Sequence, residues 1–248
     1  MKNDSKNSKK ELPAKKEILV KKGHVPQIVS EGQHPALRQV ADEISLSEIK
    51  SAKIQQVIED MKLALDSQED GIGLAAPQIG IPLRIFIVSK KIFSTHKTNG
   101  EDIKVSQKSS ETDTTDGTTK NSSKTESVKS AIPTVASSQT VIDDLVFINP
   151  VLTKESKEKK WMEGEGCLSV RWVYGKVRRS TKVTIRAYDQ FGRAFERGAG
   201  GLLAHIFQHE VDHLNGILFI DKAKDLEEVD PKEQNRSKKS SAISAKKK

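Results

Sequence analysis

The sequence predicts an α+β fold: a single compact domain of antiparallel strands around a helix, with a disordered insert and disordered tails. Three observations support this prediction. Strand patterns are gathered between two helical patterns and do not alternate with them singly. Long polar segments interrupt the apolar pattern. About 150 residues remain outside those segments, which is the size of one domain.

The first helix is predicted from an apolar stripe that ends before Gly71. Ser47 is the expected N-cap, because a serine hydroxyl can accept a hydrogen bond from the free backbone N–H groups of the first turn. The stripe has the spacing of a helix that buries one face. Its members are Ile54, Val57, Ile58, Met61 and Leu65.

Strands are predicted on both sides of the insert and again later in the chain. Residues 84–88 (RIFIV) and 145–149 (LVFIN) are short apolar runs, expected as two surface strands that the insert connects. Residues 182–189 alternate between apolar and polar and lead into a turn at 190–193. A second helix is predicted from about Gly201 to Leu214, with Gly216 as its C-terminal glycine.

The net charge of +8 is concentrated in segments that are predicted to be disordered. Residues 1–24 carry 8 Lys against 3 acidic residues, and residues 222–248 carry 9 basic against 5 acidic residues. The low-complexity insert at 93–140 contains 10 Ser and 10 Thr. A segment of this composition has too few apolar groups to offset the entropy cost of ordering. The domain is therefore predicted at 25–228, with basic tails at 1–24 and 229–248 that could contact RNA.

Composition also excludes several classes of protein. No window approaches ~18 consecutive apolar residues, so no membrane span is expected. Residues 1–24 lack the apolar core of a secretory signal. The single cysteine, Cys167, excludes an intrachain disulfide and fits a reducing cytoplasm. The segments outside the insert and tails are nearly neutral, which argues against a nucleic-acid-binding face on the domain.

The second helix carries His209-Glu210-Val211-Asp212-His213. Histidines at i and i+4 lie on one helix face and can bind one metal ion, while Glu210 can act on the attacking water as a general base. A solvent-exposed helix that happens to contain this pattern is the alternative. Burial favours the metal, because buried charges need partners. The apolar neighbours that predict burial are Leu202, Leu203, Ile206, Phe207 and Leu214.

Two further motifs complete a candidate site. Cys167, in the sequence EGCLS, offers a thiolate as a third ligand. A small buried hydrophobe and a Cys–His nucleophile remain as alternatives. In the run GIGLAAPQ (71–78), glycines permit close backbone approach and the Gln78 amide is a possible donor to an oxyanion. A tight turn between helix and strand is the simpler explanation of that run.

In this order, GIGLAAPQ, EGCLS and QHEVDH resemble the three signature motifs of bacterial peptide deformylase. The segments HPALRQVA (34–41) and NGILFID (215–221) extend the resemblance over about 27–92 and 141–225. The resemblance implies a metal-binding helix and one divalent ion held by Cys167, His209 and His213. Fe²⁺ is the first expectation and Zn²⁺ or Ni²⁺ are the alternatives, all compatible with one Cys and two His.

The resemblance also implies a reaction and further roles. The family removes the formyl group from the N-terminal formyl-methionine of newly made polypeptides and releases formate. Glu210 corresponds to the catalytic acid and base, and Gln78 and the Leu168 N–H to oxyanion donors. A pocket at Leu202 and Ile206 would receive the methionine side chain. The backbone that pairs with the substrate as an added strand corresponds to Ile72, Gly73 and Gly166.

Some features stand apart from the family pattern. Arg171-Trp172 stand where the family often has Pro-Gly, which bears on peptide preference. His205 lies one turn before His209, as a pocket-wall or surface residue or as an alternative ligand. The insert has no family counterpart, and its role is open among a spacer, a phosphorylation site and a partner-binding segment.

Two other functions compete with the deformylase interpretation. One is another H-E-x-x-H hydrolase, such as a zinc peptidase, and the other is a non-catalytic ribosome- or RNA-binding protein acting through the tails.

Overall fold

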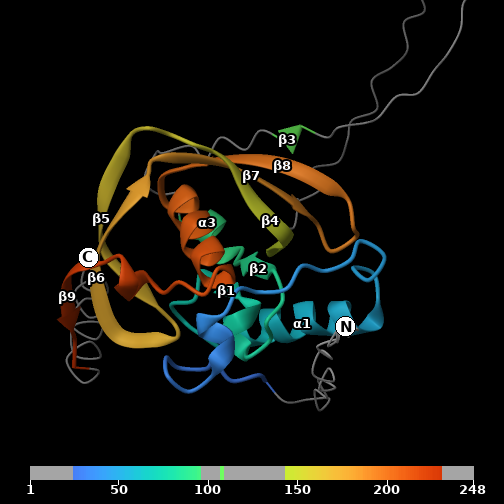
Figure 1. The fold of residues 1–248 in the computed structure, drawn as a ribbon, viewed down its shortest axis with the longest axis horizontal. Helices are drawn as coiled ribbons and strands as arrows, with labels where there is room; N and C mark the ends of the chain where they lie inside the picture. Colours follow the sequence, from blue (N-terminus) through green and yellow to red (C-terminus); the bar gives the residue numbers. More distant parts are fainter. Residues whose placement is uncertain (1–24, 96–106, 109–142, 231–248) are drawn as a thin grey trace, which may run out of the picture.

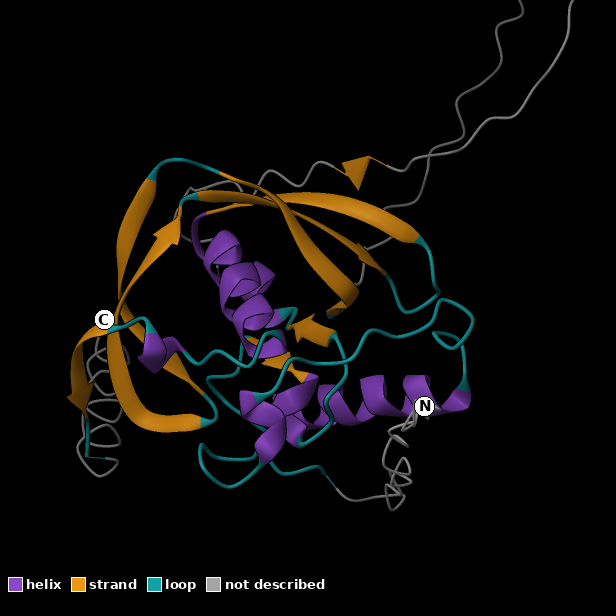
Figure 2. Cartoon of the chain, in the orientation of Figure 1, coloured by secondary structure: helices purple, strands orange, loops and turns teal. Residues whose placement is uncertain are grey.

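The computed structural model describes residues 25–95, 107–108 and 143–230, in which two sheets surround a central helix (Figures 1 and 2). One sheet has the strand order β1-β2-β4-β7-β8-β3 and the other the order β5-β6-β9, and neighbouring strands are antiparallel throughout. This architecture confirms the predicted α+β class. The strands are β1 (Gly73–Ala75), β2 (Ile85–Val88), β3 (Gln107–Lys108), β4 (Leu145–Glu155), β5 (Lys159–Cys167), β6 (Val170–Ser180), β7 (Lys182–Tyr188), β8 (Ala194–Gly200) and β9 (Lys224–Glu228). The helices are α1 (Ala52–Asp66), α2 (Lys91–Thr95) and α3 (Gly201–Leu214), with short 3₁₀ turns η1 (Pro35–Arg38), η2 (Ala76–Ile79) and η4 (Phe219–Asp221).

The core lies on both faces of the larger sheet. In Figure 1, α3 occupies the middle of the molecule, with β4, β7 and β8 curving over one side of it and α1 lying across the opposite side. Along β2, Phe86 and Val88 pack in the cluster under α3, and Ile85 and Ile87 pack in the cluster under α1. Successive strand side chains point to opposite faces, so a strand with a layer on each side must be apolar at every position.

The two strands that flank the insert are therefore core strands. The sequence analysis was right that 84–88 and 145–149 form strands, and they pair directly, with Ile85 opposite Ile148. It was wrong to expect them at the surface, because all four residues of β2 are buried. Phe86 and Phe147 stack with ring centroids 4.4 Å apart, and α3 adds Phe207 to this group.

The second predicted helix is confirmed and the start of the first is corrected. α3 has the predicted bounds, and Gly216 follows it with φ of 71°. α1 is capped by Ser51, whose Oγ accepts a hydrogen bond from the Ile54 N–H at 3.3 Å. The proposed cap, Ser47, lies in a preceding run of turns, where its hydroxyl meets that of Ser45.

The borders of the predicted insert and tail carry ordered contacts. Phe93, the first residue assigned to the insert, lies in α2 and packs against the core. Gln107–Lys108 pair with Arg197 and Glu196 of β8. Val229, assigned to the C-terminal tail, donates its N–H to the Trp172 carbonyl at 2.8 Å. The predictions for 1–24, 96–106, 109–142 and 231–248 lie outside the described residues. In the described part, no helix is long and apolar enough to cross a membrane.

Candidate metal centre

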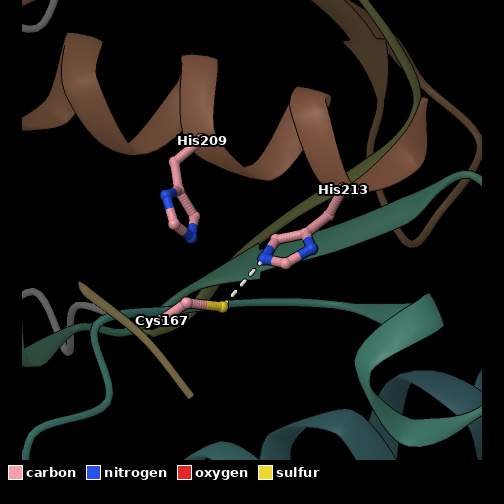
Figure 3. Close-up of side chains that lie close together, drawn as sticks. All are labelled: Cys167, His209 and His213. Carbon is pink, nitrogen blue, oxygen red and sulfur yellow. Dashed lines mark hydrogen bonds between the residues drawn. The ribbon is translucent and has the colours of Figure 1, made fainter. Parts of the chain in front are cut away.

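Three side chains that can bind a metal ion converge where β5 ends against α3. Cys167 faces His209 and His213, which project from the same side of the helix (Figure 3). Their ligand atoms all lie within 4.8 Å of one another, and Cys167 Sγ is 3.2 Å from His213 Nε2. Within the described ranges, this is the one group of three or more His, Cys, Asp or Glu side chains arranged so that it could hold a metal ion.

Local geometry explains why these residues meet. The two histidines are four residues apart, so they lie one helical turn apart on one face. Cys167 is the last residue of β5 and pairs with Val170 across a tight turn into β6. The turn therefore presents the thiol at the end of the strand, opposite the histidines.

Glu165 is a site residue that the sequence analysis missed. Its Oε1 accepts a hydrogen bond from His209 Nδ1 at 2.7 Å, and its Oε2 contacts His205 Nε2. Burial works against the charged form, but hydrogen bonds from His205, His209 and Arg179 hold the pKa of Glu165 well below its usual range. With Nδ1 bonded to Glu165, His209 keeps its other ring nitrogen free for a metal. The spacing Glu165-x-Cys167 is the signal that could have found it, because alternate residues of a strand share a face.

Arg179 joins this carboxylate to α3, the helix that carries both histidines. Its guanidinium donates to both Glu165 oxygens, at 3.1 and 2.5 Å, and to Asp212 Oδ2 at 2.6 Å. Asp212 also pairs with Lys222 Nζ at 2.6 Å. Arg179 is 4% exposed and lies on β6, so the chain of charges ties β5 and β6 to α3 beside both histidines. No short-range pattern marks Arg179, which pairs with residues 14 and 33 positions away.

Glu210 is a buried carboxylate that approaches the cluster from α3. It is 3% exposed, and its Oε2 has no hydrogen-bond partner among the described residues. Burial raises the pKa of Glu210 well above its usual range. A Cβ added to Gly73 would lie 2.4 Å from Glu210 Oε1, so only glycine leaves room for this carboxylate. An uncompensated buried carboxylate is costly and is a frequent property of catalytic acids and bases.

Gln78 is aimed at the same point from η2. Its Oε1 accepts from the Ala75 N–H at 2.8 Å, which fixes the amide so that Nε2 lies 3.5 Å from Cys167 Sγ and 3.4 Å from Ser169 Oγ. Gln78 is 1% exposed. Leu168, whose N–H was the second predicted oxyanion donor, occupies the turn between β5 and β6 beside Cys167.

A cleft of about 450 Å³ opens onto these residues. The backbone segments Gly71–Gly73 and Met162–Leu168 form two of its walls, and Leu202 and Ile206 line it from α3, as predicted. His205 also lines it and bonds Glu165 without joining the three-residue cluster. Among the alternatives left open for His205, the structure matches the pocket-wall residue and not the extra ligand.

The donor set fits a divalent cation. One sulfur and two imidazole nitrogens suit Fe²⁺, Zn²⁺ and Ni²⁺. Burial raises the pKa of the Cys167 thiol to about 12 and lowers the pKa of His213 well below its usual range. A neutral His213 is the form that ligates a metal, and a cation would supply the positive charge that a buried thiolate requires.

Comparison with known proteins places the chain in a family. The family model described as polypeptide deformylase matches residues 26–229. The chain belongs to the polypeptide deformylase family. A peptide deformylase of Fusobacterium nucleatum is 34% identical over 186 residues, covering 75% of this chain and 77% of the relative. A Met-Ala-Ser-bound class I type b peptide deformylase of Acinetobacter baumannii has a TM-score of 0.54 and 27% identity, over 79% of this chain and 96% of that one.

A plant member of the deformylase family is longer. Peptide deformylase 1A, chloroplastic/mitochondrial, of Arabidopsis thaliana is 36% identical over 202 residues, which are 82% of this chain and 62% of the relative. The chain thus spans about three fifths of that relative's length.

The two residues that depart from the family pattern both line the cleft. In this deformylase-family chain, Arg171 pairs with Asp70 at 3.1 Å and Trp172 has a φ of 67°.

Proposed function

We propose that the chain is a metal-dependent amide hydrolase that removes the formyl group from the N-terminal formyl-methionine of newly made polypeptides and releases formate. The observation that carries the proposal is the buried Glu210 carboxylate, whose Oε2 has no hydrogen-bond partner among the described residues, in a cleft that Cys167 and His209 also line. Membership of the polypeptide deformylase family supports it.

We assign the metal to Cys167, His209 and His213, with Fe²⁺ as the resident ion and Zn²⁺ or Ni²⁺ as possible substitutes. When bound, such an ion polarises a carbonyl oxygen and makes water a nucleophile at neutral pH. Glu165 orients His209 by accepting a hydrogen bond from the His209 Nδ1–H. Arg179 orients Glu165 in turn by donating to its carboxylate.

Glu210 moves the proton. Its carboxylate accepts a proton from the water that attacks the formyl carbon and then gives that proton to the departing amine. The raised pKa of Glu210 suits the second step, because a carboxyl group with an ordinary pKa is a poor acid near neutral pH.

Gln78 and Leu168 stabilise the oxyanion. The Gln78 Nε2 group, fixed through its Oε1 by the Ala75 N–H, donates to the formyl oxygen as negative charge develops there. The backbone N–H of Leu168 is the second donor, from the turn that follows Cys167.

The peptide backbone is held between two strand edges. β1 ends the six-stranded sheet and β5 ends the three-stranded sheet, and both line the cleft. A peptide in extended form can add to such edges through main-chain hydrogen bonds. We assign this pairing to Ile72, Gly73 and Gly166, and the methionine side chain to the wall at Leu202 and Ile206. The Acinetobacter baumannii structure bound to Met-Ala-Ser agrees with a methionine-first peptide.

Finer proposals concern the rest of the chain. We propose a catalytic domain at 25–228, with the insert 93–140 as a spacer and the tails 1–24 and 229–248 as a means of association with the ribosome. We propose the cytoplasm as its compartment, on the single cysteine. Co-sedimentation of full-length and trimmed protein with ribosomes at two salt concentrations tests the tails, and equal binding would refute that role.

The decisive experiment separates Glu210 from the ligands. Glu210→Gln keeps the shape of the side chain but cannot take a proton, so we expect about one bound metal and a loss of formate release of about 10²–10⁴-fold. His213→Ala removes a ligand, so metal and activity should fall together. The measurements are elemental analysis and formate release from formyl-Met-Ala-Ser, prepared anaerobically with Fe²⁺ and separately with Zn²⁺. Near-normal turnover by Glu210→Gln would refute the mechanism, and cleavage of internal peptide bonds would favour a zinc peptidase.

A further inference from the structure

An irregular stretch of β6 lines the cleft. Gly166 pairs with Tyr174 and Cys167 pairs with Val170, so three residues of β6 have no counterpart on β5. These residues are Arg171, Trp172 and Val173. Extra residues on one strand form a bulge, a feature that re-aims side chains and is common beside active sites.

Trp172 adopts a backbone conformation that bulky residues rarely adopt. Its φ is 67°, in the left-handed region that favours glycine. The conformation is held from both sides: Arg171 pairs with Asp70 at 3.1 Å and bonds the Gln68 amide oxygen, while the Trp172 carbonyl accepts from the Val229 N–H at 2.8 Å. Such strain persists only where neighbours enforce it, and it concentrates at ligand sites.

The strained backbone brings Trp172 into the wall of the cleft. Trp172 is partly buried and lines the cleft together with Tyr174, whose ring lies against Gly166. The other tryptophan of the chain, Trp161, is 46% exposed and does not line the cleft. The chain thus places one of its two tryptophans where a bound peptide would pass.

We propose that Trp172 is a specificity-determining residue that contacts the side chain following the formyl-methionine and favours an apolar one; this rests on the proposed function. Trp172 and Cys167 line the same cleft, and Trp172 lies in the stretch of β6 between the partners of Gly166 and Cys167. The formyl carbon and the second Cα of an extended peptide are separated by about 6 Å, so a formyl group at Cys167 places the second residue in the cleft that Trp172 lines. Contact between an indole ring and an apolar side chain contributes favourably to the free energy of binding.

Peptide kinetics test the proposal with the metal-loaded protein. The ratio of kcat/KM for formyl-Met-Leu-Ser to that for formyl-Met-Ala-Ser should fall about 10-fold in Trp172→Ala, mostly through KM, because the contact is a binding contact. Trp172→Gly accepts the φ without strain and should lose the same preference. The matched control, Trp161→Ala, should keep the wild-type ratio. A wild-type ratio in either Trp172 variant, or a change that follows the third residue and not the second, would overturn the proposal.

Fluorescence tests the contact without turnover. Trp161→Phe leaves Trp172 as the single tryptophan, and its emission should change when the product peptide Met-Leu-Ser is added. Trp172→Phe leaves Trp161, whose emission should stay constant. An unchanged Trp172 signal would overturn the proposal even if formate is released. If the wild-type protein releases no formate from any peptide, the proposed function fails, and the fluorescence result still decides the contact.

Discussion

The two main helices differ in how they are buried: α1 is buried along one face, whereas α3 is buried on most sides. α1 buries Ile54, Val57, Ile58, Met61, Ala64 and Leu65, with Asp60 as its one buried charged residue. α3 buries Gln208, Glu210, Asp212 and His213 among its apolar residues. Apolar burial is non-directional, whereas buried polar groups require specific partners. The difference teaches that apolar packing positions α1, whereas α3 is positioned by apolar packing together with specific hydrogen bonds and ion pairs.

Among substitutions that test this difference between the helices, replacement of Arg179 should have the largest effect. Arg179→Leu leaves Glu165 and Asp212 without their shared guanidinium and should lower the free energy of unfolding by about 3–5 kcal/mol. Urea unfolding at a fixed metal concentration measures it. The matched control is Arg193→Leu, whose pair with Asp189 leaves the arginine side chain 73% exposed and is worth at most about 1 kcal/mol. Equal losses in the two variants would mean that α3 does not depend on its buried ion pairs.

The next effect falls on Gln78, in the 3₁₀ turn that contacts both helices. Gln78→Leu should keep metal and lower the rate of formate release by about 10²–10³-fold, as expected for loss of one oxyanion donor. Gln55→Leu is the control: the Nε2 group of this α1 glutamine donates to the backbone carbonyls of Ile49 and Gln190, and Gln55 does not line the cleft. The control should have a lower free energy of unfolding but an unchanged rate of formate release and an unchanged metal content. Urea unfolding, formate release and elemental analysis measure these three quantities. A rate loss shared by both variants would remove the distinction between the two regions.

The smallest effect sharpens the description of α1. Ser51→Ala removes the hydroxyl that accepts the Ile54 N–H and should cost about 1 kcal/mol of unfolding free energy. Ser47→Ala removes a hydroxyl that only meets Ser45 and should change stability by less than about 0.5 kcal/mol. Thermal unfolding of the two variants distinguishes them. The reverse order would show that the helix begins one turn earlier.

The sequence alone determined the features that follow from the periodic pattern of neighbouring residues. The bounds of α3, the strand at 182–188 and the placement of two histidines on one face all follow from periodicity, which neighbouring residues specify among themselves. The three motifs identified the candidate ligands, Glu210 and Gln78, because their residue types and spacing are specific. Ser47 was misplaced as a cap because several serines precede the helix, and only the turns before Ser51 decide which one its first N–H groups meet.

Tertiary structure decided everything that depends on pairing between distant segments. Glu165 and Arg179 meet only because β5 pairs with β6, and Asp212 joins them only because α3 packs against β6. The burial of β2 on both faces depends on the layers that α1 and α3 add. The same holds for the bulge at Trp172, which exists as a mismatch between two strands and in neither strand alone. Register and packing arise from contacts summed over the whole domain, so no local stretch of sequence encodes them.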